Sequence, residues 1–150
     1  MIMFDTTVRI DRAPAQVFAV LADFETYLAR WAKGPIAAVR TAGNGGVGSR
    51  YTITARVGPA KVRSPYEVTS YDPPRLMAGN GVAGPVRFHE AYTLAEDRRS
   101  TVLTQSIRAT PRGAFRLVEG LLSGQLRSLI AADLDRLKSL VEAEQAPSLT

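Results

Sequence analysis

The sequence contains no cysteine and a single histidine, His89. The first absence excludes disulfides, thiolate nucleophiles and cysteine-ligated zinc. A lone histidine excludes any metal site built from several imidazoles. We therefore predict no metal site and no cofactor site. Chemistry in this chain has to come from carboxylates, tyrosines, amides and arginines.

Long hydrophobic runs are also missing. No apolar stretch approaches the roughly 18 residues that a membrane-spanning helix needs. The first ten residues carry Asp5 and lack the apolar core of a signal peptide. We therefore expect no membrane span and a cytoplasmic protein.

Lysine is scarce, because Lys33, Lys61 and Lys138 are the only lysines among 19 basic residues. The net charge is +5, but no four basic residues are consecutive. This spread does not predict a nucleic-acid partner. The length of 150 residues predicts one domain, over 1–145, with 146–150 as a disordered tail.

Periodicity predicts the order of the elements. Alternating apolar and polar residues indicate a strand over 4–10. Pro14 then opens a short helix, and Asp23 begins a second one that ends near Trp31. Period-two patterns separated by turn residues predict antiparallel strands over 36–40, 49–57, 60–70, 75–80, 86–95 and 101–109.

A long helix is predicted at the end of the chain. We expect Thr110 as its N-cap and Pro111 in its first turn. Residues 111–143 as one straight helix would be about 50 Å long, whereas a domain of this size is roughly 40 Å across. The glycines therefore predict a break near 120–124. One apolar stripe follows the break: Leu126, Ile130, Leu134, Leu137 and Val141.

Two glycine-rich segments invite other interpretations. Residues 43–48 fit the G-x-G-x-x-G pattern of dinucleotide-binding loops, but that motif requires a helix directly after it. A strand follows here, so we predict a hairpin loop. Residues 79–85 are predicted to form a second, flexible turn.

The order of elements and the local sequence resemble the helix-grip fold of the START-like, or SRPBCC, superfamily. The resemblance rests on the opening at 8–14, on Tyr27 with Trp31, and on the hairpin at 66–76. Residues 124–138 are similar to the polyketide cyclase/dehydrase-like branch. It implies an α+β fold, with a curved antiparallel sheet of about seven strands wrapped on a long C-terminal helix. Two short helices follow the first strand, and a ligand cavity lies between sheet and helix.

Glu90 is the candidate catalytic residue. Alternation places it on the cavity side of its strand with Phe88 and Tyr92, whereas His89 lies on the other face. A carboxylate among apolar neighbours has a raised pKa, as a general acid or base needs. Alternatively, Glu90 lies at the mouth of the cavity and gives a ligand polarity, or it pairs with Arg108 or another arginine.

Residues of three kinds are predicted to contact a ligand: aromatic side chains, one amide and aliphatic side chains. For each of them ordinary core packing is the alternative. The candidates are Tyr27, Trp31, Tyr51, Ile53, Tyr66, Phe88, Tyr92, Gln105, Leu122 and Leu126.

Three functions remain open from the sequence. The first is binding of a small hydrophobic ligand, similar to a lipid, quinone or polyketide. The second is a polyketide cyclase/dehydratase-type enzyme that uses Glu90 as acid or base. The third is an interaction protein that uses the C-terminal helix or a basic outer sheet face formed by Arg50, Arg56, Lys61, Arg63 and Arg87. Whatever the function, we expect a monomer or a homodimer.

Overall fold

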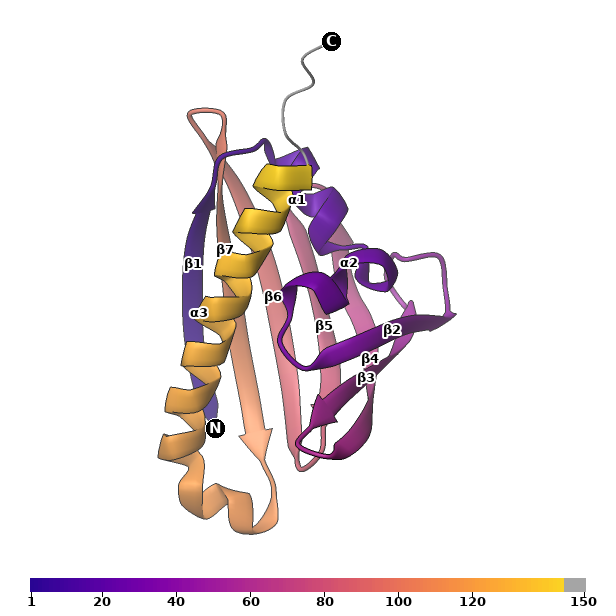
Figure 1. Cartoon of the computed structure of the whole chain (residues 1–150), viewed down its shortest axis with the longest axis vertical. Helices are drawn as coiled ribbons and strands as arrows, with labels where there is room; N and C mark the ends of the chain where they lie inside the picture. Colours follow the sequence, from indigo (N-terminus) through magenta and orange to yellow (C-terminus); the bar gives the residue numbers. More distant parts are fainter. Residues whose placement is uncertain (145–150) are drawn as a thin grey trace.

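The computed structural model describes residues 1–144, and its helices all lie on one side of a curved antiparallel sheet (Figure 1). Residues 145–150, with the predicted tail, lie outside the described residues. The elements in chain order are β1 (Ile2–Ile10), α1 (Pro14–Leu21), α2 (Phe24–Trp31), β2 (Pro35–Ala42), β3 (Arg50–Val57), β4 (Ala60–Asp72), β5 (Leu76–Ala83), β6 (Val86–Asp97), β7 (Ser100–Pro111), the 3₁₀ helix η1 (Gly113–Val118) and α3 (Glu119–Glu144).

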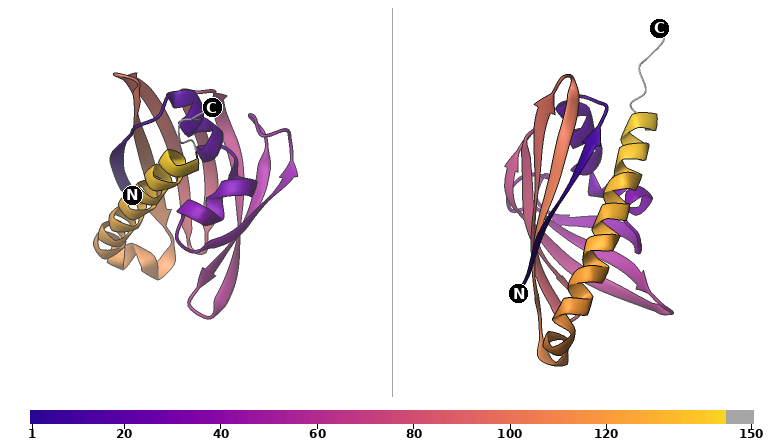
Figure 2. Two further views of the ribbon diagram at one scale, coloured as in Figure 1. Left: turned by 45° about the horizontal axis from the view of Figure 1, so that its top comes forward. Right: turned by 90° about the vertical axis from the view of Figure 1, so that its left-hand side faces the viewer.

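Within residues 1–144 the sheet has seven strands in the order β1-β7-β6-β5-β4-β3-β2. Strands β2 to β7 form a meander, and β1 pairs antiparallel with β7 at the far edge. Seen from that edge, the sheet curls around the side on which α3 lies (Figure 2). The helix-grip fold and the α+β class are therefore confirmed.

The starts of the two short helices follow from their sequences. Pro14 is the first residue of α1, where its missing N–H is no loss. Asp23 caps α2, because its Oδ1 accepts a hydrogen bond from the Thr26 N–H at 3.3 Å. Both starts were predicted.

The main core fills the space between the sheet, α1, α2 and the second half of α3 (residues 132–144). Leu134, Leu137 and Val141 of α3 are completely buried there. They pack with Leu21 of α1 and Leu103 of β7 in the same cluster. The apolar stripe of the last helix is thus core over its second half.

The beginning of the last helix differs from the prediction. Thr110 and Pro111 belong to β7, where Pro111 pairs with Val86, and the Arg112 N–H donates to the Pro85 carbonyl at 3.0 Å. Strand pairing to β6 therefore outweighs the local capping signal. Neither residue caps a helix.

The break or kink predicted near 120–124 is not found as a break within the α-helix. The chain changes from the 3₁₀ helix to the α-helix at Glu119, and α3 continues through both Gly120 and Gly124. Nothing lies within 4 Å of a Cβ built on either glycine. An exposed glycine weakens a helix by only about 1 kcal/mol, which does not break it.

The turn predicted at 79–85 is mostly strand, because β5 continues to Ala83. A Cβ on Gly79 would lie 2.3 Å from the Tyr66 ring, and one on Gly81 would lie 2.3 Å from the Phe88 ring. These glycines therefore make room for two aromatic rings on the concave face. The glycines at 43–48 form the predicted hairpin loop, between β2 and β3.

In residues 1–144, no helix combines the length and the apolar character that crossing a membrane requires.

Candidate functional site

A cavity of about 380 Å³ lies between the first half of α3 (residues 119–131) and the ends of β1, β6 and β7. Its volume falls within the range of small-molecule sites. Apart from Glu90 and Gln125 its walls are apolar: Ile2, Ala83, Val86, Phe88, Ile107, Ala109, Leu122, Leu126, Leu129 and Ile130.

The cavity exists because α3 packs tightly over one half only. All its buried residues belong to the second half, beginning with Asp133. In the first half Leu121 is 65% exposed, and Leu122 and Leu126 are half-buried against a small cluster that includes Phe4 and Ile107. The first half of the helix is thus mainly a wall of the cavity, and Ile130 at its end packs against both the small cluster and the main core.

Glu90 is the polar group in the sheet wall of this cavity. Glu90 is only 8% exposed to solvent. The Gln105 Nε2 donates to the Glu90 Oε2 at 3.0 Å and lies 3.1 Å from the Tyr92 hydroxyl. No arginine bonds to Glu90 within residues 1–144, so the predicted alternative of an arginine pair is wrong.

Burial shifts the pKa of the Glu90 carboxyl group. Loss of water raises the pKa of Glu90, and the neighbouring side chains of Tyr66, Tyr92 and Gln105, which favour its charged form, lower it in part. Burial also raises the pKa values of Tyr66 and Tyr92 well above the ordinary value, and the charge of Glu90 adds to both shifts. The two phenols therefore stay protonated around neutral pH, while Glu90 can hold or release a proton.

Three buried polar atoms near Glu90 lack a hydrogen-bond partner in the described part of the chain. They are the Trp31 Nε1, the Tyr66 hydroxyl and the Gln105 Oε1. Trp31 packs edge-on against Tyr92, with ring centroids 6.5 Å apart. A buried unsatisfied atom costs about 1–3 kcal/mol. We call Trp31, Tyr66, Glu90, Tyr92 and Gln105 the polar cluster.

The structure brings together most of the candidate residues from the sequence. Four of them line the cavity, namely Phe88, Glu90, Leu122 and Leu126. Trp31, Tyr66, Tyr92 and Gln105 are buried around Glu90. Ile53 packs half-buried against the main core.

Tyr27 and Tyr51 do not line the cavity. The ring of Tyr51 packs on Phe24, with centroids 5.3 Å apart, because this part of β3 lies under α2. Burial raises the pKa of Tyr51, and the nearby Arg40 guanidinium lowers it. The ring of Tyr27 faces the guanidinium of Arg30.

Several lining residues were missed in the sequence. Ile2 lies two positions before the predicted start of the first strand, and Ala109 is the last residue of the strand predicted over 101–109, on the same face as Ile107. Gln125 and Leu129 lie one helical turn from predicted residues on the same face of α3. Extending each register would have found them, since the cavity lies where the strands end.

His89 lies on the outer face, as its register predicted. Its Nδ1 is 2.6 Å from the Asn80 Oδ1 on the neighbouring strand. Of the basic residues predicted on that face, Arg50 lies 3.8 Å from the Glu67 carboxylate. Arg56 lies just beyond the first residue pair of β2 and β3, which is Pro35 with Ala55. At this end of β3 it also lines a hollow beside α3. Residues 1–144 hold no group of three metal-ligating side chains.

Residues 1–142 match the protein family described as "Polyketide cyclase / dehydrase and lipid transport". A search of curated proteins gave no match. Among solved structures, TTHA0849 from Thermus thermophilus is similar with a TM-score of 0.81 at 17% identity, covering 96% of this chain and 99% of that one. The ZhuI aromatase/cyclase from Streptomyces sp. R1128 has a TM-score of 0.80 at 17% identity, covering 93% of each chain.

A norcoclaurine synthase from Thalictrum flavum, a point mutant bound to a transition-state analogue, has a TM-score of 0.70 at 15% identity and covers 96% of each chain. At these identities the likeness to solved structures shows the fold alone.

Proposed function

Because the chain belongs to the polyketide cyclase/dehydrase and lipid transport family, we propose that it binds a small hydrophobic ligand in the cavity beside α3. The ligand is of the lipid, quinone or polyketide type. The observation that supports this is an apolar cavity of about 380 Å³ with the carboxyl group of Glu90 in its wall. Apolar area removed from water supplies the affinity, at about 25 cal/mol per Å².

The polar cluster gives the ligand its orientation. An apolar pocket with a few placed polar groups is typical of small-molecule sites. A ligand oxygen beside Glu90 meets a carboxyl group that accepts a hydrogen bond when ionised and donates one when protonated.

Binding of Nile red, a neutral apolar dye, tests this function. Leu126→Trp adds volume in the cavity and is expected to weaken dye binding at least about tenfold, equivalent to 1.4 kcal/mol. Ser139→Trp is the matched control, because Ser139 is exposed on the second half of α3. Equal dye binding by wild type and Leu126→Trp would contradict the proposal. If dye binding is weakened as expected, native mass spectrometry of protein purified from its own cells is the next step, because it identifies the class of the natural ligand.

A second candidate function is acid–base catalysis on the bound molecule. It is favoured by the combination of a carboxyl group with a raised pKa and two protonated tyrosines beside it. In a cyclase or dehydratase, Glu90 would accept a proton from a carbon next to a carbonyl. Tyr66, whose hydroxyl is unpartnered, would donate a hydrogen bond to the carbonyl oxygen.

Glu90→Gln separates the two functions. If the chain is a catalyst, the variant binds a polyketone substrate but loses turnover by about 10²–10⁴-fold. Full turnover by the variant would remove Glu90 from the chemistry and leave the binding function intact.

A further inference from the structure

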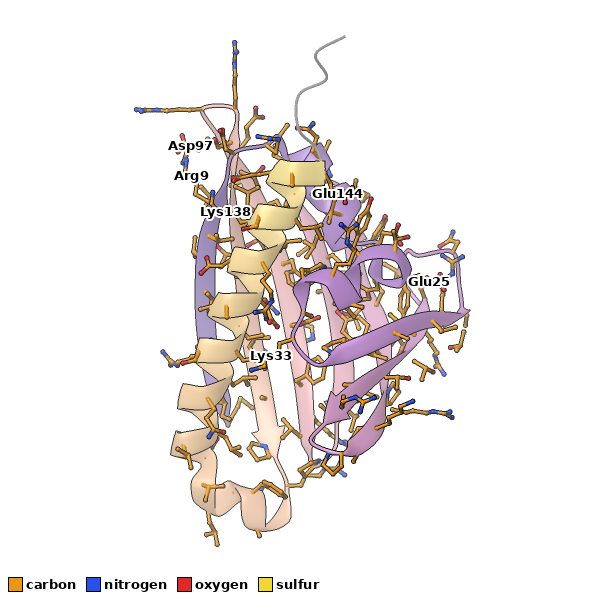
Figure 3. The ribbon with its side chains drawn as sticks, in the orientation of Figure 1. Arg9, Glu25, Lys33, Asp97, Lys138 and Glu144 are labelled. Carbon is orange, nitrogen blue, oxygen red and sulfur yellow. The ribbon has the colours of Figure 1, made fainter. Side chains whose placement is uncertain are left out.

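A second hollow adjoins the ligand cavity on the other side of α3. It lies between α3, the end of β3 and the loop from α2 to β2, in which Figure 3 labels Lys33. Gln125 and Leu129 line both hollows. The two hollows are therefore neighbours that share part of their lining. We call this second hollow the rim.

Three cations line the rim: Lys33, Arg56 and Arg136. Arg136 already bonds to other groups of the protein. Its Nε donates to the Trp31 carbonyl at 3.0 Å, and its Nη2 donates to Asp133. In the described residues, the side chains of Lys33 and Arg56 form no hydrogen bond or ion pair.

The nearest carboxylate does not neutralise these two charges. Asp133 is only 5% exposed. Its Oδ1 accepts hydrogen bonds from the Lys33 backbone N–H, at 3.0 Å, and from Arg136. Arg136 therefore balances Asp133, and two positive charges remain at the rim without a carboxylate of their own.

Backbone contacts hold the main chains of Lys33 and Arg56 close together. The Asp133 bond fixes the Lys33 backbone against α3. The Arg56 N–H donates to the Gly34 carbonyl at 2.9 Å, which ties the end of β3 to the residue after Lys33. The chain thus places two unpaired cations in the lining of a hollow that adjoins the apolar cavity.

We propose that the natural ligand is an amphipathic anion, with its apolar chain in the cavity and its carboxylate or phosphate group bound by Lys33 and Arg56. Charge-assisted hydrogen bonds are about twice as strong as neutral ones, and an arginine holds either oxyanion with two parallel bonds. The inference rests on the proposed function, because it assigns the two ends of a ligand whose body occupies the cavity.

Displacement of Nile red by three molecules with the same twelve-carbon chain tests the proposal. They are dodecanoic acid, dodecyl phosphate and dodecan-1-ol, used at neutral pH and below their aggregation thresholds. The wild type is expected to bind at least one of the anions about tenfold more tightly than the alcohol. Which anion binds more tightly distinguishes a carboxylate ligand from a phosphate ligand.

Two double variants with the same change in charge complete the test. Lys33→Gln with Arg56→Gln is expected to remove the preference for the anion and to leave the affinity for the alcohol unchanged. Arg98→Gln with Arg99→Gln, both exposed in the turn between β6 and β7, is expected to keep the preference.

Each other outcome overturns the inference. Equal binding of acid, phosphate and alcohol by the wild type refutes the anion site but supports the hydrophobic cavity. Equal loss of preference in both double variants assigns the effect to the overall charge of the protein. Absence of binding by all three molecules and by Nile red refutes the proposed function itself, and the anion site with it.

Discussion

At the scale of single residues, Glu90 occupies a buried position, where the charged form of a carboxyl group is destabilised. Its burial raises its pKa, while Gln105 and Tyr92 stabilise its charged form in part. A chain selected for stability alone would place an apolar residue or an amide here. Glu90 is therefore the residue for which we propose a role in ligand binding or catalysis.

Glu90→Gln is expected to raise the stability of the protein at neutral and alkaline pH. The folded-state pKa of Glu90 is raised, so the folded protein holds this proton more tightly than the unfolded chain does. Stability therefore falls as pH rises above the unfolded value of about 4.5, and glutamine removes that loss. Thermal unfolding at pH 4 and pH 8 checks this: the gain, a few degrees at roughly 2–4 °C per kcal/mol, is expected at pH 8 only.

A gain of equal size at both pH values would contradict this account. It would show that the amide simply packs better than the carboxyl group, whatever its charge.

Gly79→Ala is expected to destabilise the protein by about 1–3 kcal/mol, as overpacking a core does. The added Cβ would lie 2.3 Å from the ring of Tyr66, whose other side is held by Phe24. Denaturant unfolding measures the change. Gly124→Ala is the matched control, because its Cβ meets open space in a helix, and it is expected to stabilise by up to about 1 kcal/mol. Equal stability of Gly79→Ala and the wild type would show that the Tyr66 ring can move away.

Sequence alone could place Glu90, because a strand alternates with a fixed period and the apolar neighbours of Glu90 define its face. The same reasoning could not separate Tyr92 from Tyr51. Both point to the concave side, but α2 covers Tyr51 and leaves the Glu90 region open. Which part of a face is covered depends on contacts far apart in the sequence.

At the scale of elements, the two halves of α3 have different structural roles. The second half is core, and the first half is a cavity wall. The hydrophobic stripe runs through both halves, so its periodicity alone does not show where the core ends and the cavity wall begins. The difference arises because α1 and α2 fill the space opposite only the second half.

Alanine substitutions in the two halves are expected to act differently. Leu134→Ala removes a fully buried side chain and is expected to cost about 2–5 kcal/mol. Leu126→Ala removes a side chain that already faces a cavity and is expected to cost about 1 kcal/mol or less. Denaturant unfolding gives both values. Equal costs would contradict the division of the helix.

The elements themselves were largely predictable, because the period-two pattern is strong from 49 to 109. Errors fell where two signals compete. At 110–111 a capping motif competed with strand pairing, and at 79–83 glycines were read as a turn although they accommodate rings from β4 and β6. In both cases the deciding partner lies on another strand.

At the scale of the whole molecule, polar contacts join the end of α3 to the beginning of the chain. The Asp11 N–H donates to the Glu142 Oε2 at 2.8 Å, and the Arg12 Nη2 donates to the Glu142 carbonyl at 2.5 Å. Lys138 donates to the Arg9 carbonyl, near the Arg9–Asp97 ion pair labelled in Figure 3. These contacts lie at the opposite end of α3 from the cavity.

Glu142→Gln is expected to lower stability by about 0.5–1 kcal/mol at pH 7, because the pair with Lys138 is partly exposed. The hydrogen bond from Lys138 lowers the pKa of Glu142. The stabilisation is therefore complete above the unfolded value of about 4.5 and is lost as pH falls through the lower folded value. Thermal unfolding at pH 7 and pH 3 checks this, with the exposed Glu96→Gln as control. A difference from wild type that persists at pH 3 would contradict this assignment.

The division of α3 also has an evolutionary consequence. Side chains in its first half can change size or polarity with little penalty to folding, because the second half and the polar contacts near Glu142 hold the helix in place. Relatives could therefore diverge in what they accept while keeping one scaffold. Directed evolution of a new ligand preference should begin at Leu122, Gln125, Leu126 and Leu129, where variation is tolerated, and leave the rest of the helix untouched.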